Sequence, residues 1–312
     1  MSAARGGASP GPSAAGQQVA LPTAHRGPWS EAWRRLLSNR LAVAGMATVA
    51  FLVLVAVLAN LVGRSNPTFQ DYSAIQERPS ARHWLGTDEL GRDAFSRLVH
   101  GARVSLAVGM FTQLIALSIG LPVGAIAGFA GGRTDNALMR LVDIVYGFPD
   151  LLFIILLRAV FGGSVFMIFL AIGLVVWSNI ARLIRGQILT LKEQEFITAA
   201  RATGGTGTHI VLRHLIPNSL GPVTVAVSFG IPRAIFTEAA LSYIGIGVNP
   251  PTPTWGSMIR DGYSLIFSSP HLVAIPAVAI AVTMLAFTFL GDGLRDALDP
   301  HTRGASRLGT GR

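Results

Sequence analysis

The stretch QILTLKEQEFITAARATGGTGTHIVLRHLIPN, Gln187 to Asn218, is the longest polar interruption in the apolar second half of the chain. Its pattern predicts a short amphipathic helix, a glycine break and a second short helix that is stopped by Pro217. Three glycines permit the backbone angles that end the first helix, and four apolar residues share or flank one of its faces. These residues are Gly204, Gly205 and Gly207, and Leu189, Phe196, Ala200 and Ile197. The pattern is typical of a docking element, and it contains no catalytic constellation.

The composition of the whole chain indicates a membrane protein. Of 312 residues, 51% are hydrophobic and 13% are charged, and the mean hydropathy is +0.52. Soluble domains carry about 25% charge. The absence of cysteine excludes disulfides, thiolate metal sites and cysteine nucleophiles. The net charge of +9 comes almost wholly from arginine, and Lys192 is the only lysine. In so apolar a chain, this excess of positive charge is better explained by arginines on the cytoplasmic side of a membrane, as the positive-inside rule describes, than by nucleic-acid binding.

Six apolar runs are long enough to cross a hydrocarbon core of ~30 Å. The third run is interrupted at Phe148-Pro149-Asp150 and the fifth at Pro232. Arginine-bearing segments place both termini and the Gln187–Asn218 loop in the cytoplasm. The predicted fold class is an all-α membrane protein with six transmembrane helices, and the runs are about 41–62, 104–130, 138–160, 165–180 with its flanks, 220–248 and 271–290.

The same pattern divides the chain into four regions. Residues 1–28 read as a disordered tail, because they are rich in Ala, Gly, Ser and Pro and lack an apolar core. Residues 29–103 hold a basic amphipathic segment, the first span and an outer loop. Residues 104–298 form a core of five spans that includes the loop 187–218, and 299–312 is a polar C-terminal tail.

Local patterns give further expectations. In the outer loop, Thr87 or Asp88 is a predicted N-cap of an amphipathic helix through Phe95 and Leu98. Near the inner interface, a turn at 131–140 precedes the third span, and Asp143 is placed to pair with Arg140. A ridge of small residues in the second span predicts close approach of another helix: Gly120, Gly124 and Gly128.

Charged residues raise two questions of binding. Asp88, Glu89 and Asp93 are candidate metal ligands, although nearby arginines favour the interpretation of solvated loop carboxylates. Arg233 and Glu238 lie inside the fifth span, where charges are expensive and usually face a bundle interior or cavity. They are candidates to line a pathway through the bundle; alternatively, neighbouring helices satisfy both. We predict no metal site and no catalytic residue.

The loop has the spacing of a known signature. Thr198-Ala199-Ala200, three residues, Gly204, nine residues and then His214-Leu215-Ile216-Pro217 resembles the loop E-A-A, three residues, G, nine residues, I-x-L-P of binding-protein-dependent ATP-binding cassette (ABC) importer permeases. Thr198 replaces the glutamate, His214 the isoleucine and Ile216 the leucine. Three more stretches resemble the C-type inner-membrane subunit of the dipeptide/oligopeptide branch: HWLGTDELGRDAFSRLVHGARVSL, EAALSYIGIGVNPPTPTWGSM and GDGLRDALDP.

The resemblance implies a type I ABC importer permease fold in a bacterial cytoplasmic membrane. It implies a heterodimer with a second permease subunit, two ABC ATPase subunits that use ATP and Mg, an extracytoplasmic substrate-binding protein and a peptide substrate. This subunit itself would be non-catalytic, with no bound cofactor, surrounded by lipid and with no nucleic-acid partner. The loop would fit a cleft in an ATPase through Glu195, Thr198, Ala199, Ala200, Arg201, Gly204, Gly205, His214, Pro217 and Asn218.

Some alternatives stay open at this point. Arg201 is equally well explained as a partner contact or as a positive-inside charge, and Glu195 is placed to substitute in part for the missing glutamate. We expect Gly204→Val or Pro217→Ala to uncouple ATP hydrolysis from uptake. A same-family permease for nickel or another metal chelate is the nearest rival. An ion-gradient-driven secondary transporter and a membrane-bound enzyme are rivals from other classes.

Overall fold

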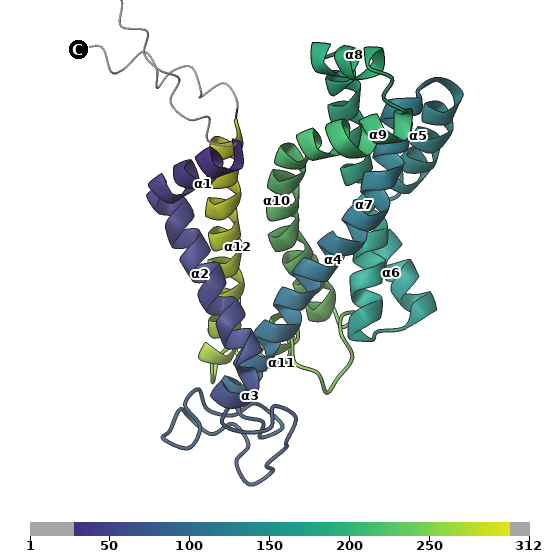
Figure 1. Cartoon of the computed structure of the whole chain (residues 1–312). Helices are drawn as coiled ribbons and strands as arrows, with labels where there is room; N and C mark the ends of the chain where they lie inside the picture. Colours follow the sequence, from purple (N-terminus) through teal and green to yellow (C-terminus); the bar gives the residue numbers. More distant parts are fainter. Residues whose placement is uncertain (1–27, 300–312) are drawn as a thin grey trace, which may run out of the picture.

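A computed structural model describes residues 28–299, and every regular element in this part is helical (Figure 1). The elements are α1 (Pro28–Ser38), α2 (Arg40–Val57), α3 (Ala59–Val62), α4 (Ala94–Ala130), α5 (Gly132–Tyr146), α6 (Asp150–Phe161), α7 (Val165–Leu191), α8 (Glu195–Ala202), α9 (Gly207–Ile210), the π-helical turn η1 (Val211–Leu215), α10 (Ile216–Tyr243), α11 (Trp255–Tyr263) and α12 (His271–Leu298). Apart from Pro28 and Asp299, the two predicted tails lie outside the described residues.

The predicted spans correspond to long apolar helices. Five stretches are long and apolar enough to cross a membrane: α2, α4, α7, the continuous helical stretch Gly207–Tyr243, and α12. The helices α5 and α6 pass the same test together as a sixth span, bent by 86° at a short break. The break falls at the Phe148-Pro149-Asp150 interruption, so that prediction is confirmed. Proline here leaves the preceding residue outside the helical region and ends α5.

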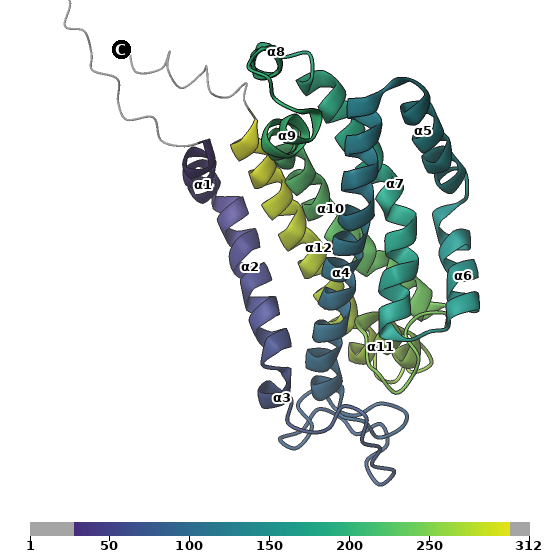
Figure 2. The ribbon, with the colours of Figure 1, turned by 45° about the vertical axis from the view of Figure 1, so that its right-hand side comes forward.

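The helices form a bundle with two distinct ends (Figures 1 and 2). We call the end that carries α1, α8, α9 and the start of α5 the α8 end, and the end that carries α3, α11 and the segment 63–93 the α11 end. The helix α12 packs between α2 and α10, and α4 packs against α7. The first described helix and the last turn of α12 both lie at the α8 end.

The glycine ridge on α4 explains the closest of these contacts. A Cβ at Gly120 would lie 2.7 Å from the Trp177 carbonyl oxygen, and one at Gly124 would lie 2.4 Å from that of Ala181. Both carbonyls belong to α7. The absence of side chains therefore lets the two backbones approach, as predicted.

Two predicted boundaries are wrong. The N-cap of α4 is Asp93, whose carboxylate accepts a hydrogen bond from Ser96 N at 2.7 Å, and not Thr87 or Asp88. Thr87 instead bridges to Asp93 and donates its hydroxyl to the Ala74 carbonyl, while Asp88 binds arginines. The predicted amphipathic helix through Phe95 and Leu98 is thus the first part of α4.

The expected turn at 131–140 is also mostly helix, because α5 already begins at Gly132. Asp143 does not pair with Arg140; it binds Arg182 of α7 at 2.6 Å. The neighbouring Asp135 accepts two hydrogen bonds from Arg185, at 2.5 and 2.6 Å. Asp143 therefore pairs with an arginine of α7 and not with Arg140 of its own helix, because α5 runs alongside α7 (Figure 2).

Candidate functional site

The loop at the α8 end is attached to the bundle by one buried side chain of α8. Ile197 is fully buried and packs in a core that includes Ile188, Ile210 and Leu215. The predicted shared face of Leu189 and Phe196 is wrong, because α7 ends at Leu191 and α8 begins only at Glu195. Phe196 is 42% exposed. Ala200 also packs against this core, and Glu195, Thr198, Ala199 and Arg201 of this short helix face outward.

Gly204 ends α8 by a specific hydrogen-bonded motif. Its φ is +82°, and Gly205 N donates to the Ala200 carbonyl at 3.0 Å while Gly204 N donates to that of Arg201 at 3.0 Å. These two bonds form a Schellman motif, in which the residue with positive φ is usually glycine. The predicted glycine end of the first helix is therefore confirmed.

Pro217 does not stop a helix, contrary to the sequence prediction. The helical stretch runs without interruption from Gly207 to Tyr243, and Pro217 is the second residue of α10. The five residues before α10 form the π-helical turn η1. Pro217 consequently falls in the first turn of α10, where proline's missing N–H is tolerated.

The loop residues divide into an exposed row and a shallow depression. Glu195, Thr198, Ala199 and Arg201 are exposed on α8. Among residues 28–299, the ion pairs include neither Glu195 nor Arg201. An open depression beside this row is lined by Ala200, Thr203, Gly204, Gly205, Thr206, His209 and His214.

His214 joins α8 to the turn that follows it. Its ring lies 6.5 Å from that of Phe196 and 5.7 Å, edge-on, from that of His209. The Asn218 amide donates to the His214 carbonyl at 2.6 Å, and Pro217 beside it is exposed. Of the predicted loop residues, the structure brings Ala200, Gly204, Gly205 and His214 together around this depression.

The two charged residues of the fifth span lie in different surroundings. Arg233 donates to Asp150, the first residue of α6, at 2.9 Å, and both line a cavity of about 250 Å³ between α6, α7 and α10. Glu238 is fully buried, and one carboxylate oxygen accepts a hydrogen bond from Ser242 at 2.6 Å. Glu238 does not line the cavity, and its other carboxylate oxygen has no hydrogen-bond partner within residues 28–299.

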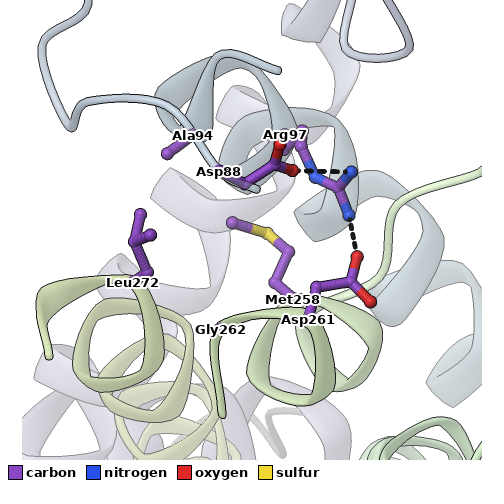
Figure 3. A pocket seen from close by; sticks show the side chains of 7 residues that line it. All are labelled: Asp88, Ala94, Arg97, Met258, Asp261, Gly262 and Leu272. Atoms are coloured by element: carbon purple, nitrogen blue, oxygen red, sulfur yellow. Dashed lines mark hydrogen bonds and ion pairs between the residues drawn. The ribbon is translucent and has the colours of Figure 1, made fainter. Parts of the chain in front are cut away.

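Sequence reasoning missed a buried charge cluster at the α11 end, which we call the arginine pin: Asp88, Arg92, Arg97 and Asp261. Asp261 accepts from Arg92 at 3.0 Å and from Arg97 at 2.8 Å, and Asp88 contacts both arginines at 2.7 and 3.1 Å. Figure 3 shows Arg97 between the two carboxylates, with Met258 next to it and Leu272 across the pocket. The pin fastens the segment 63–93 and the start of α4 to α11.

The interpretation of Asp88 and Asp93 as solvated carboxylates is therefore wrong, because both residues are 6% exposed. The Asp93 carboxylate lies 2.8 Å from Nδ1 of His83 and accepts the capping hydrogen bond from Ser96 N. No group of three His, Asp or Glu side chains in the described residues is arranged to hold a metal ion. One sequence signal for the pin existed, since Asp261 is the only acidic residue between Glu238 and Asp292.

Comparisons with known proteins agree along most of the chain. A family model described as a binding-protein-dependent transport system inner membrane component matches residues 120–304, and one described as the N-terminal TM domain of oligopeptide transport permease C matches 27–79. The chain is 41% identical to the oligopeptide transport system permease protein OppC of Bacillus subtilis, over 88% of this chain and 90% of that protein.

Other relatives have similar coverage. The dipeptide transport system permease protein DppC of Bacillus subtilis is 41% identical over 88% of this chain and 86% of its own length. The glutathione transport system permease protein GsiD of Pectobacterium atrosepticum is 41% identical over 88% and 92%. A chain of the inward-facing MetNI methionine ABC transporter superposes with a TM-score of 0.53 at 21% identity, covering 65% of this chain and 96% of that one. This last likeness shows a common fold.

Proposed function

Since the chain belongs to the family of binding-protein-dependent transport system inner membrane components, we propose that it is the C-type permease subunit of an ATP-driven importer of dipeptides or oligopeptides. The observation that carries the proposal is the similarity to oligopeptide and dipeptide permeases, which extends over 88% of the chain. Family membership disfavours an ion-driven secondary transporter and a membrane enzyme. Glutathione, named for one relative, is itself a small peptide and fits the same proposal.

The protein is a multi-pass protein of the cytoplasmic membrane, as its apolar helices and its relatives indicate. We place the α8 end in the cytoplasm, because Arg185, which binds Asp135 in the first turn of α5, and Arg201 of α8 lie there, and the positive-inside rule assigns such charges to the cytoplasmic face. Both ends of the chain then lie inside. The region 29–103 supplies the first span and the outer loop, and 104–298 supplies the remaining five spans.

We propose that α8 is the contact with an ATPase subunit. Its outward face offers Glu195, Thr198 and Arg201 as polar groups, and Ala199 as a small residue that permits close approach. The depression beside it, lined by Gly204, Gly205 and His214, is continuous with this face. ATP and Mg would be used by two such ATPase subunits, while a second permease subunit and an external binding protein complete the importer.

Co-purification tests the assembly. The tagged chain, solubilised gently from its native membrane, is expected to bring down a second permease subunit and ATPase subunits. Proteoliposomes with the purified complex and its binding protein are expected to accumulate a labelled dipeptide only in the presence of ATP and Mg. A complex without an ATPase, or uptake that follows an ion gradient instead of ATP, would contradict the proposal.

Glu195→Gln is expected to weaken ATPase retention about twofold to fivefold, the range for an exposed ion pair. Glu195 is unpaired within the described residues and lies three positions before Thr198, where the family signature has glutamate. Adding Thr198→Glu is expected to restore retention, measured as the ATPase bound to the tagged permease across a salt titration. Equal retention by all three proteins would remove Glu195 from the contact.

A further inference from the structure

The ion pair between Asp150 and Arg233 differs from the other ion pairs of the bundle in its position. Asp150 begins α6 directly after the 86° break, and Arg233 lies on α10 beside Pro232. The break lies between the two ends of the bundle (Figure 2). The two side chains meet at 2.9 Å across 83 residues of sequence, so the pair links two separate spans inside the bundle.

The surroundings of the pair are otherwise apolar. The adjoining cavity of about 250 Å³ is lined by residues such as Ile154, Val175 and Phe236. Asp150 and Arg233 are the only charged side chains among the described residues that line it. An isolated charge in such a setting is expensive, and intramembrane ionisable residues usually pair for this reason. Each of these two charges therefore needs an opposite charge at every stage of transport.

The pair is nevertheless accessible. The Arg233 side chain is 66% exposed and that of Asp150 is 43% exposed. In the arginine pin, by contrast, Arg97 and Asp88 are 3% and 9% exposed and are held by several partners. Arg233 and Asp150 are instead open to a ligand within the cavity.

We propose that Asp150 and Arg233 hold the charged termini of the peptide during passage, so that Arg233 binds the carboxylate and Asp150 binds the ammonium group. The proposal rests on the peptide-importer function given above. Inserting a zwitterion replaces one ion pair with two and leaves neither protein charge unpaired. After release, the protein pair re-forms.

The dimensions favour a short peptide. An extended dipeptide spans roughly 7 Å, so Asp150 and Arg233 must separate from 2.9 Å to receive its two ends. The break before α6 supplies a place where this movement can occur, since α6 is joined to α5 by three residues. A cavity of about 250 Å³ lies just below the usual range of small-ligand pockets, about 300–1,000 Å³, so it has to enlarge as the two charges separate to hold a dipeptide between them.

The test uses the complete reconstituted importer and a labelled free dipeptide. Arg233→Gln, and the neutral double variant Asp150→Asn/Arg233→Gln, are each expected to lower uptake about tenfold or more, because a charge-assisted contact to the substrate is lost. The swapped variant Asp150→Arg/Arg233→Asp is expected to recover uptake to within about threefold of wild type, since a zwitterion can bind in the reverse direction. ATP hydrolysis stimulated by the binding protein is measured in parallel.

The neutral double variant separates recognition from fastening. If the pair only fastens α6 to α10, removing both charges leaves no unpaired charge, and the neutral double variant transports the dipeptide as the wild type does. That result would overturn the proposal. The proposal is supported if the neutral double variant loses dipeptide uptake and the swapped variant recovers it. It is contradicted if the swapped variant forms a normally assembled complex that does not recover uptake. The matched control is Asp143→Asn/Arg182→Gln, an exposed pair between α5 and α7 outside the cavity, which is expected to change uptake less than about twofold.

The two proposals fail in different ways. A wild-type complex that accumulates no peptide at all refutes the proposed function before any variant is compared. A wild-type complex that accumulates dipeptide, together with a neutral double variant that transports equally well, refutes only the role of Asp150 and Arg233.

Discussion

Gly204→Val is expected to abolish most peptide uptake while the importer remains in the membrane and still hydrolyses ATP. At φ +82° a β-branched residue is strained by about 1–3 kcal/mol. The variant therefore disrupts the Schellman motif that fixes the direction of the chain after α8. No atom lies within 4 Å of a Cβ at Gly204, so the damage stays within the loop. Uptake is expected to fall about tenfold or more, in line with this strain.

Three controls make the measurement specific. Gly204→Asn is expected to keep most uptake, because asparagine tolerates the left-handed region. Gly131→Val places similar strain at φ +64°, also in open space, but in the turn between α4 and α5. Pro217→Ala, which the sequence alone groups with Gly204→Val, is now expected to be silent, since Pro217 lies within a continuous helix. Uptake by Gly204→Val at the wild-type level would contradict a coupling role for this turn.

Asp261→Asn is expected to prevent stable assembly of the α11 end. Asp261 is the shared partner of Arg92, Arg97 and, at 3.0 Å, Arg260. Asparagine removes the negative charge and leaves Asp88 as the single carboxylate of the pin against two buried guanidinium groups. Breaking a buried pair by removing one partner costs about 3–5 kcal/mol. The variant is expected to show a much lower Tm in detergent and rapid proteolysis in the segment 63–93.

Asp71→Asn is the matched control in the same segment. Asp71 pairs with the exposed Arg82 at 3.4 Å, and an amide oxygen can still accept the hydrogen bond that Ser73 N donates to its carboxylate. We expect its Tm and protease pattern to match those of the wild type. A normal Tm for Asp261→Asn would show that Arg92 and Arg97 tolerate the lost charge, and the pin would then have no structural role.

Structural features that depend only on residues close together in the sequence were predictable. Apolar runs located the spans, because a bilayer sets a minimum length for a helix. Gly120, Gly124 and Gly128 predicted the close contact of α4 with α7, and Gly204 predicted the end of α8. Each of these inferences depends on local spacing or on the conformational freedom of one residue.

Features that depend on distant partners were not predictable. Arg97 and Asp261 are 164 residues apart, and Arg233 and Asp150 are 83 apart, so no local pattern joins them. The same lack of tertiary information made Asp88 read as solvated and assigned Asp143 to Arg140 instead of Arg182. Pro217 was misread because the π-helical turn before it changes the usual consequence of proline, and nothing in the composition of that turn announces it.

The continuity of the helical stretch Gly207–Tyr243 has a mechanical consequence. The proposed ATPase contact on α8 is followed, after the turn 203–206, by one curved helix that leads to Arg233, and its path from Gly207 to Arg233 is about 39 Å at 1.5 Å per residue. A rotation imposed at the α8 end would be transmitted along this helix to the Arg233 guanidinium. The angular position of Arg233 around the helix axis is then as important as the length of the helix. One residue inserted near Thr224 would turn Arg233 by about 100° around the helix axis relative to the loop. The same ATPase-driven rotation would then move the guanidinium past Asp150 instead of toward it.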